Sequence, residues 1–230
     1  MNEIKTLRVE VASSKHLKYV DIINDHIDLA SKQRGTGIAR RTYEYLAAKM
    51  EEGKAVIALD GEEFAGFCYI ETWGTSKYVA NSGLIVNPAY RGVGLAKQIK
   101  MKAFELSRSR YPDAKIFGLT TGMAVMKINH QLGYRPVTYS ELTDDESFWK
   151  GCQGCVNYDI LTRTERSKCL CTGMLFDPAW EQEKNGPSST SANGTSQEIR
   201  KRSLLDYMKK LNPLQAMDLI RKYSNKQPKA

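Results

Sequence analysis

The spacing of apolar residues switches repeatedly between two periods over the first 180 positions. A two-residue alternation or a short apolar run, typical of strands, occurs in residues 4–11, 55–59, 64–71, 78–86 and 115–121. Apolar residues three or four positions apart, typical of one helix face, occur in residues 20–30, 46–50, 95–106 and 125–132. Up to residue 139 the predicted order is therefore β, α, α, β, β, β, α, β, α, β.

Turn signals and this order define the fold class. Asp60-Gly61 lies between two strand signals and predicts a β-hairpin, whereas the helix over 95–106 separates two strands and predicts a crossover. Hairpins combined with a crossover helix favour an α/β (α+β) fold, with a mixed, mostly antiparallel sheet and helices on both faces. The last strands are expected at 134–139, 156–163 and 169–176.

Composition divides the chain into three parts. Residues 185–196 consist of Gly, Pro, Ser, Thr and Asn apart from Ala192, so they cannot bury enough apolar surface to offset the entropy lost on ordering. We therefore expect a folded domain over 1–180, a flexible linker over 181–196 and a basic tail over 197–230. The apolar positions of the tail predict two short helices on either side of Pro213.

The net charge of +8 is concentrated in the tail. Residues 197–230 contain nine Lys or Arg and three Asp or Glu, a charge of +6, which leaves +2 for residues 1–196. The basic character therefore belongs to the tail and not to the domain. Nucleic-acid binding by the tail ranks last among the expected functions, because Tyr207 and Tyr223 are its only aromatic residues and its lysines can simply be solvated. No apolar run approaches the ~18–20 residues that span a bilayer, so no membrane partner is expected.

The stretch LIVNPAYRGVGLAKQIKMKAFEL (84–106) carries the strongest functional signal. A predicted strand leads through a glycine-containing loop into a helix, whose first turn has unpaired backbone N–H groups and the positive end of the helix dipole. Gly92, Gly94 and Ala96 are small, so a phosphate can approach these N–H groups closely. The pattern lacks the third glycine of a dinucleotide site and the GK[ST] of a P-loop. It therefore predicts another kind of pyrophosphate site, or else a strand–turn–helix with incidental glycines.

The sequence resembles the GNAT acyltransferases at two motifs. The run RGVGLA (91–96) matches the family's (Q/R)-x-x-G-x-(G/A) motif, and AVMKINHQLGY (124–134) resembles its last helix before LGF or LGY. This resemblance covers roughly residues 4–164. It implies the GNAT fold and an acyl-coenzyme A (acyl-CoA) donor.

The resemblance also implies the residues of the donor site. The pyrophosphate would be held by backbone N–H groups of Arg91, Gly92, Val93, Gly94, Leu95 and Ala96. The pantetheine amides would pair with the strand edge at Leu84, Ile85 and Val86, and Asn129 would contact the coenzyme arm. Many GNAT enzymes carry a tyrosine in place of Asn129, as the acid that protonates the leaving thiolate, so the chain departs from the family there.

Direct acyl transfer requires a neutral amine, a polarised thioester carbonyl and correct positioning, but neither a metal nor a covalent cysteine. Glu71 ends a strand near where GNAT enzymes often place a base. It is the candidate base, with a solvated strand-end carboxylate as the alternative. His130, Tyr134 and Tyr139 lie near Asn129 in the sequence, and Tyr139 is the second candidate catalytic residue.

Three arginines, Arg34, Arg40 and Arg41, lie in the segment RGTGIARR between the first two helices. In the GNAT fold this region lines the acceptor pocket, and arginine forks suit carboxylates, although a solvated basic loop has the same composition. The phrases RGTGIARRT, FAGFCYIETWG and CVNYDIL resemble a GNAT subgroup of Bacteroidetes-type bacteria, which is thought to acylate glutamate in arginine synthesis. That resemblance implies a small amino-acid acceptor, glutamate first, and acetyl-CoA or succinyl-CoA as co-substrate.

Four late cysteines form two closely spaced pairs, Cys152-x-x-Cys155 and Cys169-x-Cys171, as in some zinc sites. If 156–163 and 169–176 form a hairpin, eight residues of strand, or roughly 26 Å, separate the pairs. We therefore expect no metal and reduced structural cysteines. Reduced thiols also fit the odd total of five cysteines and the lack of a secretory signal, which favour a cytoplasmic location.

Two other functions stay open. A protein or peptide N-acetyltransferase would use the same donor site, with an open groove in place of a charged pocket. A CoA-binding regulatory module without chemistry is motivated by the missing tyrosine. The sequence also leaves open the acyl group and the oligomeric state, a homodimer included.

Overall fold

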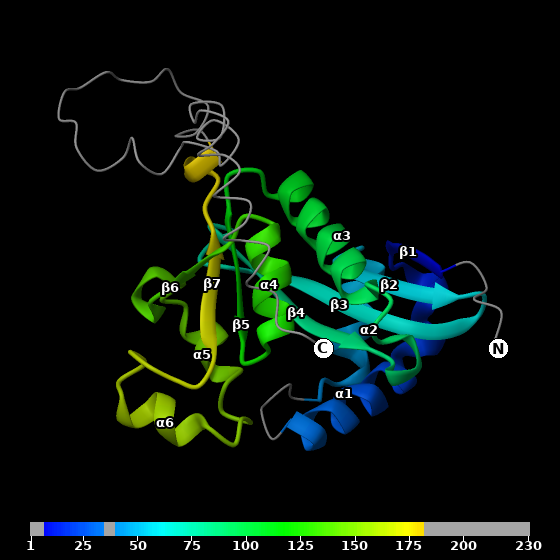
Figure 1. The fold of residues 1–230 in the computed structure, drawn as a ribbon, viewed down its shortest axis with the longest axis horizontal. Helices are drawn as coiled ribbons and strands as arrows, with labels where there is room; N and C mark the ends of the chain where they lie inside the picture. Colours follow the sequence, from blue (N-terminus) through cyan, green and yellow to red (C-terminus); the bar gives the residue numbers. More distant parts are fainter. Residues whose placement is uncertain (1–6, 35–39, 182–230) are drawn as a thin grey trace, which may run out of the picture. The chain divides into compact units, whose positions relative to one another are not determined.

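One sheet of seven strands forms the centre of the computed structural model, which describes residues 7–34 and 40–181 (Figure 1). The elements in chain order are β1 (Leu7–Val11), η1 (Ser14–Tyr19), α1 (Val20–Arg34), α2 (Tyr43–Glu51), β2 (Ala55–Asp60), β3 (Glu63–Trp73), β4 (Tyr78–Val86), η2 (Pro88–Tyr90), α3 (Leu95–Arg110), β5 (Lys115–Thr120), α4 (Met123–Gln131), β6 (Arg135–Val137), η3 (Tyr139–Glu141), α5 (Glu146–Lys150), α6 (Tyr158–Arg163) and β7 (Thr172–Phe176). The predictions for the tail, and for all of the linker but its first residue, lie outside the described residues. None of the described helices is both long and apolar enough to cross a bilayer.

The strand order is β1-β2-β3-β4-β5-β7-β6. Every neighbouring pair is antiparallel except β4 and β5, which α3 connects as a crossover helix. The predicted mixed, mostly antiparallel sheet is therefore confirmed, as is the predicted order of elements up to residue 139.

Three groups of buried side chains cover the two faces of the sheet. Alternate residues of β2 and β3 point to opposite faces, so Ile57 packs with α1 and α2 while Val56 packs with α3. In β5, Ile116 belongs to the α3 face and Phe117 to a third cluster on the other face, formed with η3, α5 and α6. The segment after β6 thus covers the β5–β7 half of the face that α1 and α2 cover over β1–β3 (Figure 1).

The centre of the sheet opens where β4 leaves β5. These two strands pair only over Tyr78–Ala80 and Lys115–Phe117, after which β5 continues to pair with β7. On its other side, β4 pairs with β3 through a bulge, because Phe67 faces Ile85 while Tyr69 faces Ser82. The C-terminal half of β4 therefore has β3 on one edge and no parallel strand on the other within the described residues.

The predicted strand over 156–163 is wrong, since residues 158–163 form helix α6. Tyr158 and Leu161, three positions apart, face the third cluster, whereas Val156 is 73% exposed. An apolar run this short matches both the two-residue period of a strand and the 3.6-residue period of a helix, so tertiary packing determines which one forms. The strands predicted at 134–139 and 169–176 are present but shorter, at 135–137 and 172–176.

Candidate active site

The loop between β4 and α3 has the backbone shape that anion binding requires. Gly92 and Gly94 both adopt left-handed conformations, with φ of 85° and 81°, and α3 begins directly after Gly94. Within the described residues, the backbone N–H groups of residues 92–96 meet no backbone acceptor. The loop therefore presents unpaired donors at the positive end of a 16-residue helix, a geometry that suits a pyrophosphate. The predicted set of donors is shortened by one, because the Arg91 N–H donates to the Pro88 carbonyl at 3.3 Å.

Asn87 fixes the start of this loop, a role that the sequence did not reveal. Its side-chain Nδ2 donates to the Phe64 carbonyl at 2.9 Å, and its Oδ1 accepts from the Ala89 N–H at 3.1 Å. Its own N–H donates to the Ala65 carbonyl at 2.9 Å. One side chain thus ties the loop to β3 and turns the chain toward Gly92.

The predicted pantetheine edge, Leu84 to Val86, lies in the half of β4 that has left β5. The bulge is shaped by Gly83, whose φ is 67°. A Cβ at Gly83 would lie 2.5 Å from a ring carbon of Tyr69, so no side chain fits there while the ring keeps its place. Tyr69 itself is buried, so its ring packs directly against β4 beside the predicted pantetheine edge.

Asn129, the predicted coenzyme contact, contains a buried polar atom without a partner. The residue is 1% exposed, and its Oδ1 has no hydrogen-bond partner in the described part of the chain. A buried acceptor left without a donor is unfavourable by about 1–3 kcal/mol. An amide N–H of a ligand would remove that cost, which fits the predicted role.

A polar cluster lies beneath the opening between β4 and β5. Asn81 receives hydrogen bonds at its Oδ1 from Tyr134 at 3.0 Å and from Lys100 at 3.3 Å, and its Nδ2 donates to Ser107 at 2.9 Å. Lys100 is 2% exposed and faces no carboxylate among the described residues. Burial lowers the pKa of Lys100 and raises that of Tyr134.

Replacing Lys100 by Met is expected to raise the free energy of unfolding at pH 7 by about 1 kcal/mol. Because burial lowers the pKa of Lys100 in the folded chain, the unfolded chain binds more protons in the range between that lowered pKa and the ordinary value of 10.5. The stability of the parent should therefore rise as the pH approaches 10.5, and that rise should be smaller in the variant. Urea unfolding between pH 7 and 10 measures both effects.

Lys102→Met is the matched control, because Lys102 is on the same helix but 41% exposed. It should leave the stability and its pH dependence nearly unchanged. A Lys100 variant with the pH profile of the parent would show that this lysine does not titrate differently on folding.

Glu71, the predicted base, lies in a cluster at the α2 side of the sheet. Its Oε2 accepts a hydrogen bond from Tyr45 at 2.5 Å and forms an ion pair with Lys49 at 2.6 Å. The side chains of Glu71 and Lys49 are only 17% and 10% exposed. Burial, Tyr69 and the hydrogen bond to Glu71 together raise the pKa of Tyr45. The Tyr45 hydroxyl therefore stays protonated and donates a hydrogen bond to the Glu71 carboxylate.

Two of the three predicted acceptor arginines, Arg40 and Arg41, have different partners in the structure. Arg41 is half-buried, and its Nε donates to the Tyr69 hydroxyl at 3.1 Å while its guanidinium lies over the Tyr45 ring. Arg40 is exposed and forms an ion pair with Asp28 at 2.6 Å. Arg34 ends α1, and its side chain is outside the described set.

Arg41 faces no carboxylate within hydrogen-bond distance in residues 7–34 and 40–181. Burial lowers its pKa, but Tyr69, Tyr45 and Glu71 outweigh burial, so the pKa of Arg41 is raised and its charge is kept. A half-buried cation whose side-chain partner is a neutral hydroxyl is suited to an incoming carboxylate. Of the two predicted arginines whose side chains the structure describes, Arg41 is therefore the better candidate for a carboxylate, and Arg34 stays a prediction.

Tyr139, the other candidate catalytic residue, lies apart from this cluster. It is 7% exposed, and its hydroxyl donates to the Cys171 carbonyl at 2.7 Å. Burial and the neighbouring thiols raise its pKa. This geometry favours a structural role, because the phenolic proton is already bound to a backbone acceptor.

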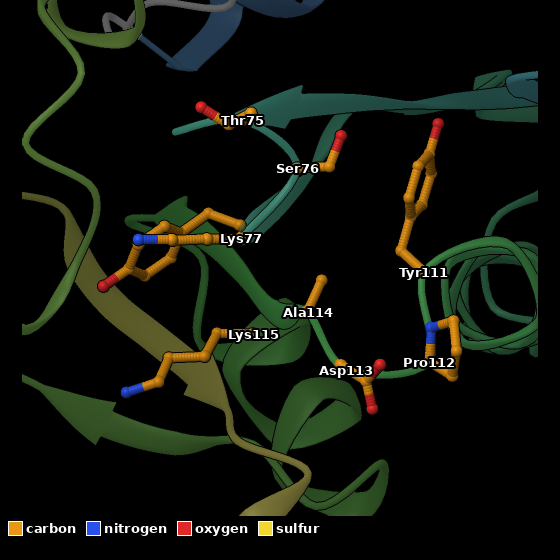
Figure 2. Close-up of a pocket in the computed structure, with 9 residues that line it drawn as sticks. Thr75, Ser76, Lys77, Tyr111, Pro112, Asp113, Ala114 and Lys115 are labelled. Atoms are coloured by element: carbon orange, nitrogen blue, oxygen red, sulfur yellow. The ribbon is translucent and has the colours of Figure 1, made fainter.

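The most evident cavity lies away from these residues. It has a volume of about 410 Å³ and lies between the β3–β4 turn and the connection from α3 to β5. Figure 2 shows Thr75 and Ser76 on one side of it and Tyr111 and Pro112 on the other. This cavity is at the start of β4 and the end of α3, the opposite ends of both elements from residues 92–96. It therefore does not belong to the predicted donor site.

Sequence reasoning missed Tyr45, Lys49 and Tyr69. Tyr45 and Lys49 are four positions apart on α2, so they share a face, and this spacing was a readable signal. Tyr69 resembled an ordinary core residue of β3, and only its contact with Arg41 distinguishes it.

Comparisons with known proteins agree with this architecture. Residues 39–127 match the profile of the Acetyltransferase (GNAT) family, and no curated protein matches the sequence. The N-acetylglutamate synthase from Neisseria gonorrhoeae, solved with CoA and N-acetyl-glutamate, superposes with a TM-score of 0.53 at 13% identity. That match covers 75% of this chain but only 35% of the synthase, so the chain spans about a third of that protein.

Two shorter proteins match over nearly their whole length. The yncA structure from Salmonella typhimurium, which holds its cofactor acetyl-CoA, has a TM-score of 0.51 at 13% identity and covers 83% of this chain and 99% of its own. Rv2747 from Mycobacterium tuberculosis, in complex with CoA, has a TM-score of 0.52 at 14% identity, and the match covers 74% of this chain and 98% of Rv2747. At these identities the likeness establishes the fold, and the described part of the chain has the fold of the GNAT acetyltransferases, as the sequence predicted.

Proposed function

We propose that this protein is an acyl-CoA-dependent N-acyltransferase that acts on the amine of a small amino acid. The observation that carries the proposal is the loop before α3, where two left-handed glycines and unpaired N–H groups meet a helix N-terminus. Such a loop suits the pyrophosphate of CoA. Structures of this fold that hold CoA or acetyl-CoA support that choice.

The rest of the donor follows from the opening in the sheet. Pantetheine would lie along β4 from Val86 toward Ala80, with its amides on the free strand edge and one of them near the Oδ1 of Asn129. A bound β-strand-like ligand satisfies the backbone groups that β5 leaves free. The thioester then lies near the β4 bulge, against which Tyr69 packs.

The acceptor we propose is an amino acid with a side-chain carboxylate, glutamate first. Arg41 supplies a charged fork beside Glu71 and Tyr69, and a carboxylate bound there would leave the α-amine free to face β4. The sequence resemblance to the glutamate-acylating subgroup and the fold shared with the Neisseria synthase support this choice. A place in arginine biosynthesis, and acetyl-CoA or succinyl-CoA as donor, belong to the same proposal.

The chemistry we propose is direct transfer in a ternary complex. The neutral amine forms a C–N bond to the thioester carbonyl carbon, the C–S bond breaks, and CoA leaves as a thiolate that takes a proton from water, while the amine nitrogen loses one proton to a base. Glu71 is positioned for that role only in part, because Lys49 and Tyr45 both bind its Oε2 and leave Oε1 for the amine. Tyr139 is not proposed as the acid that protonates the leaving thiolate, because its hydroxyl already donates a hydrogen bond to the Cys171 carbonyl.

An amino-acid panel tests the acceptor. With acetyl-CoA and succinyl-CoA as donors, release of free CoA thiol should be fastest with glutamate and at least tenfold slower with glutamine, because glutamine has the same size but no side-chain charge. The thiol assay reads turnover for each pair.

Equal turnover with glutamine would contradict the carboxylate proposal while leaving the acyltransferase proposal intact. Turnover only with peptides would favour a protein N-acetyltransferase. Tight CoA binding without turnover of any amine would favour a regulatory module.

A further inference from the structure

The four late cysteines lie on one side of the fold, although the sequence predicted that they would be far apart. That prediction depended on a hairpin between 156–163 and 169–176, and the chain forms helix α6 in place of the first strand. After α6 the chain reverses at Glu165 and Arg166, which both adopt left-handed backbone conformations. The Arg166 backbone N–H donates to the Leu161 carbonyl at 2.9 Å. The segment carrying Cys169 is thereby returned toward the start of α6.

A bidentate ion pair holds this reversal in place. Both terminal nitrogens of Arg166 bond the two carboxylate oxygens of Glu146 at 2.6 Å, and Glu146 begins α5, which leads directly to Cys152. The N–H of Cys152 in turn donates to the Trp149 carbonyl at the end of α5. The two cysteine segments are therefore connected through α5.

Contacts of the sulfur atoms bring the pairs together around one residue, Asn157. The Asn157 N–H donates to the Cys155 Sγ at 3.5 Å, and the Cys169 Sγ bonds the Asn157 carbonyl at 3.9 Å. The Cys152-to-Cys155 segment closes as a turn, with the Cys155 N–H on the Cys152 carbonyl at 2.9 Å. Cys171 packs against the same buried cluster as Cys152 and Cys169.

Thiols and amides are the main polar groups of this cluster, and its surroundings are apolar. Cys152, Cys169 and Cys171 pack against the third core cluster, and all four cysteines are free and half-buried. Soft thiolates in a closed set of four select Zn²⁺ among the common divalent metals.

We propose that Cys152, Cys155, Cys169 and Cys171 bind one structural Zn²⁺ ion. Among the described residues, no three His, Cys, Asp or Glu side chains are already placed to hold a metal ion, so the proposal requires the thiols to turn inward. Each cysteine has a single side-chain torsion that moves its sulfur without the backbone. Four S–H bonds break as four Zn–S bonds form, the protons leave to water, and no electrons are transferred.

The ion would join the cysteine cluster to the sheet. The hydroxyl of Tyr139 donates to the carbonyl of Cys171, which directly precedes β7. A metal that orders residues 152–171 would therefore stabilise the packing on the third core cluster without taking part in acyl transfer.

Metal analysis of the full chain tests the proposal. The protein purified under reducing conditions should retain about one zinc per chain by mass spectrometry of the metal. Replacement by Co²⁺ should give thiolate charge-transfer bands and the visible bands of a tetrahedral site. Cys152→Ser combined with Cys155→Ser should reduce both signals to near zero.

Cys68→Ala is the matched control, since Cys68 is a thiol in the core, outside the cluster. It should keep the zinc and the Co²⁺ spectrum. If the double variant does not fold, chelator titration of the parent gives the same answer, because removal of a structural ion should lower its melting temperature.

Either of two outcomes would overturn the proposal. One is a parent chain that retains no zinc and shows no tetrahedral Co²⁺ spectrum. The other is loss of thiols in pairs on exposure to oxidised glutathione with no metal bound, which would indicate disulfides instead. Neither outcome affects the proposed acyltransferase activity, which thiol release measures separately.

Discussion

Gly94→Glu is expected to weaken acyl-CoA binding about a thousandfold. The new carboxylate would project from the N-terminus of α3 beside the proposed pyrophosphate. Two like charges about 4 Å apart repel by about 4 kcal/mol at an effective dielectric constant near 20, which is roughly a thousandfold in dissociation constant. Gly94 has φ of 81°, so a side chain also strains the loop by about 1–2 kcal/mol. Calorimetric titration with acetyl-CoA measures the loss.

Gly74→Glu is the matched control for strain and charge. Gly74 lies in the β3–β4 turn with φ of 56°, at the opposite end of β4 from residues 92–96, and a Cβ there would make only van der Waals contacts, at 3.5 Å from Tyr78 and 3.7 Å from Thr143. The control therefore carries a similar backbone cost and the same added charge away from the loop. It should bind acetyl-CoA as the parent does. Equal binding by the Gly94 variant would move the donor site away from this loop.

Arg41→Ala is expected to raise the acceptor KM by roughly 10- to 100-fold. A hydrogen-bonded charge pair that is partly desolvated contributes about 1.5–3 kcal/mol, and the variant loses all of it. Arg41→Lys keeps the charge but not the fork, so its KM should lie between those of the parent and Arg41→Ala. Initial rates against glutamate at saturating acetyl-CoA give the values.

Arg40→Ala is the neighbouring control, because Arg40 is exposed and already paired with Asp28. Its acceptor KM should change less than about threefold, as expected for an exposed ion pair. With succinyl-CoA as donor, an increase in donor KM for Arg41→Ala alone would show that Arg41 also contacts the succinyl carboxylate. Equal effects of the two substitutions would assign acceptor binding to the whole loop.

The backbone shape of the proposed donor loop was readable from the sequence because short-range geometry determines it. Gly92 and Gly94 occur where only a left-handed backbone lets a strand turn into a helix, and the structure has both in that conformation. Apolar spacing likewise predicted α3, since Leu95, Ile99 and Ala103 form one buried stripe. Signals of this kind extend over a few residues and survive without knowledge of the tertiary contacts.

The acceptor side could not be read in this way because tertiary contacts determine it. Arg40 and Arg41 are adjacent and chemically equal, yet one meets Asp28 and the other meets Tyr69. The partner of Glu71 is Lys49, which comes from another element 22 positions earlier. Nothing local to Glu71 indicates that pair.

The cysteine segment shows a different limit. Val156, Tyr158 and Ile160 alternate with polar residues and match a strand, but the same residues fit one turn of helix. Asn157 directly precedes helix α6, and Glu165 and Arg166 adopt left-handed conformations after it. Neither feature can be recognised as a helix boundary until the chain reversal at 165–166 has been seen. Because the sequence predicted a strand where the chain forms helix α6, it also predicted that the two cysteine pairs would lie far apart.

Tyr69 has a consequence for the energetics of two substrates. Its hydroxyl accepts from Arg41, while its ring lies against Gly83 in the β4 bulge, so one rigid side chain contacts the regions proposed for acceptor and donor. Any displacement of the ring by one ligand changes the free energy of binding the other. Thermodynamic linkage makes that change equal in both directions, so a donor that tightens acceptor binding must itself be held more tightly once the acceptor is present.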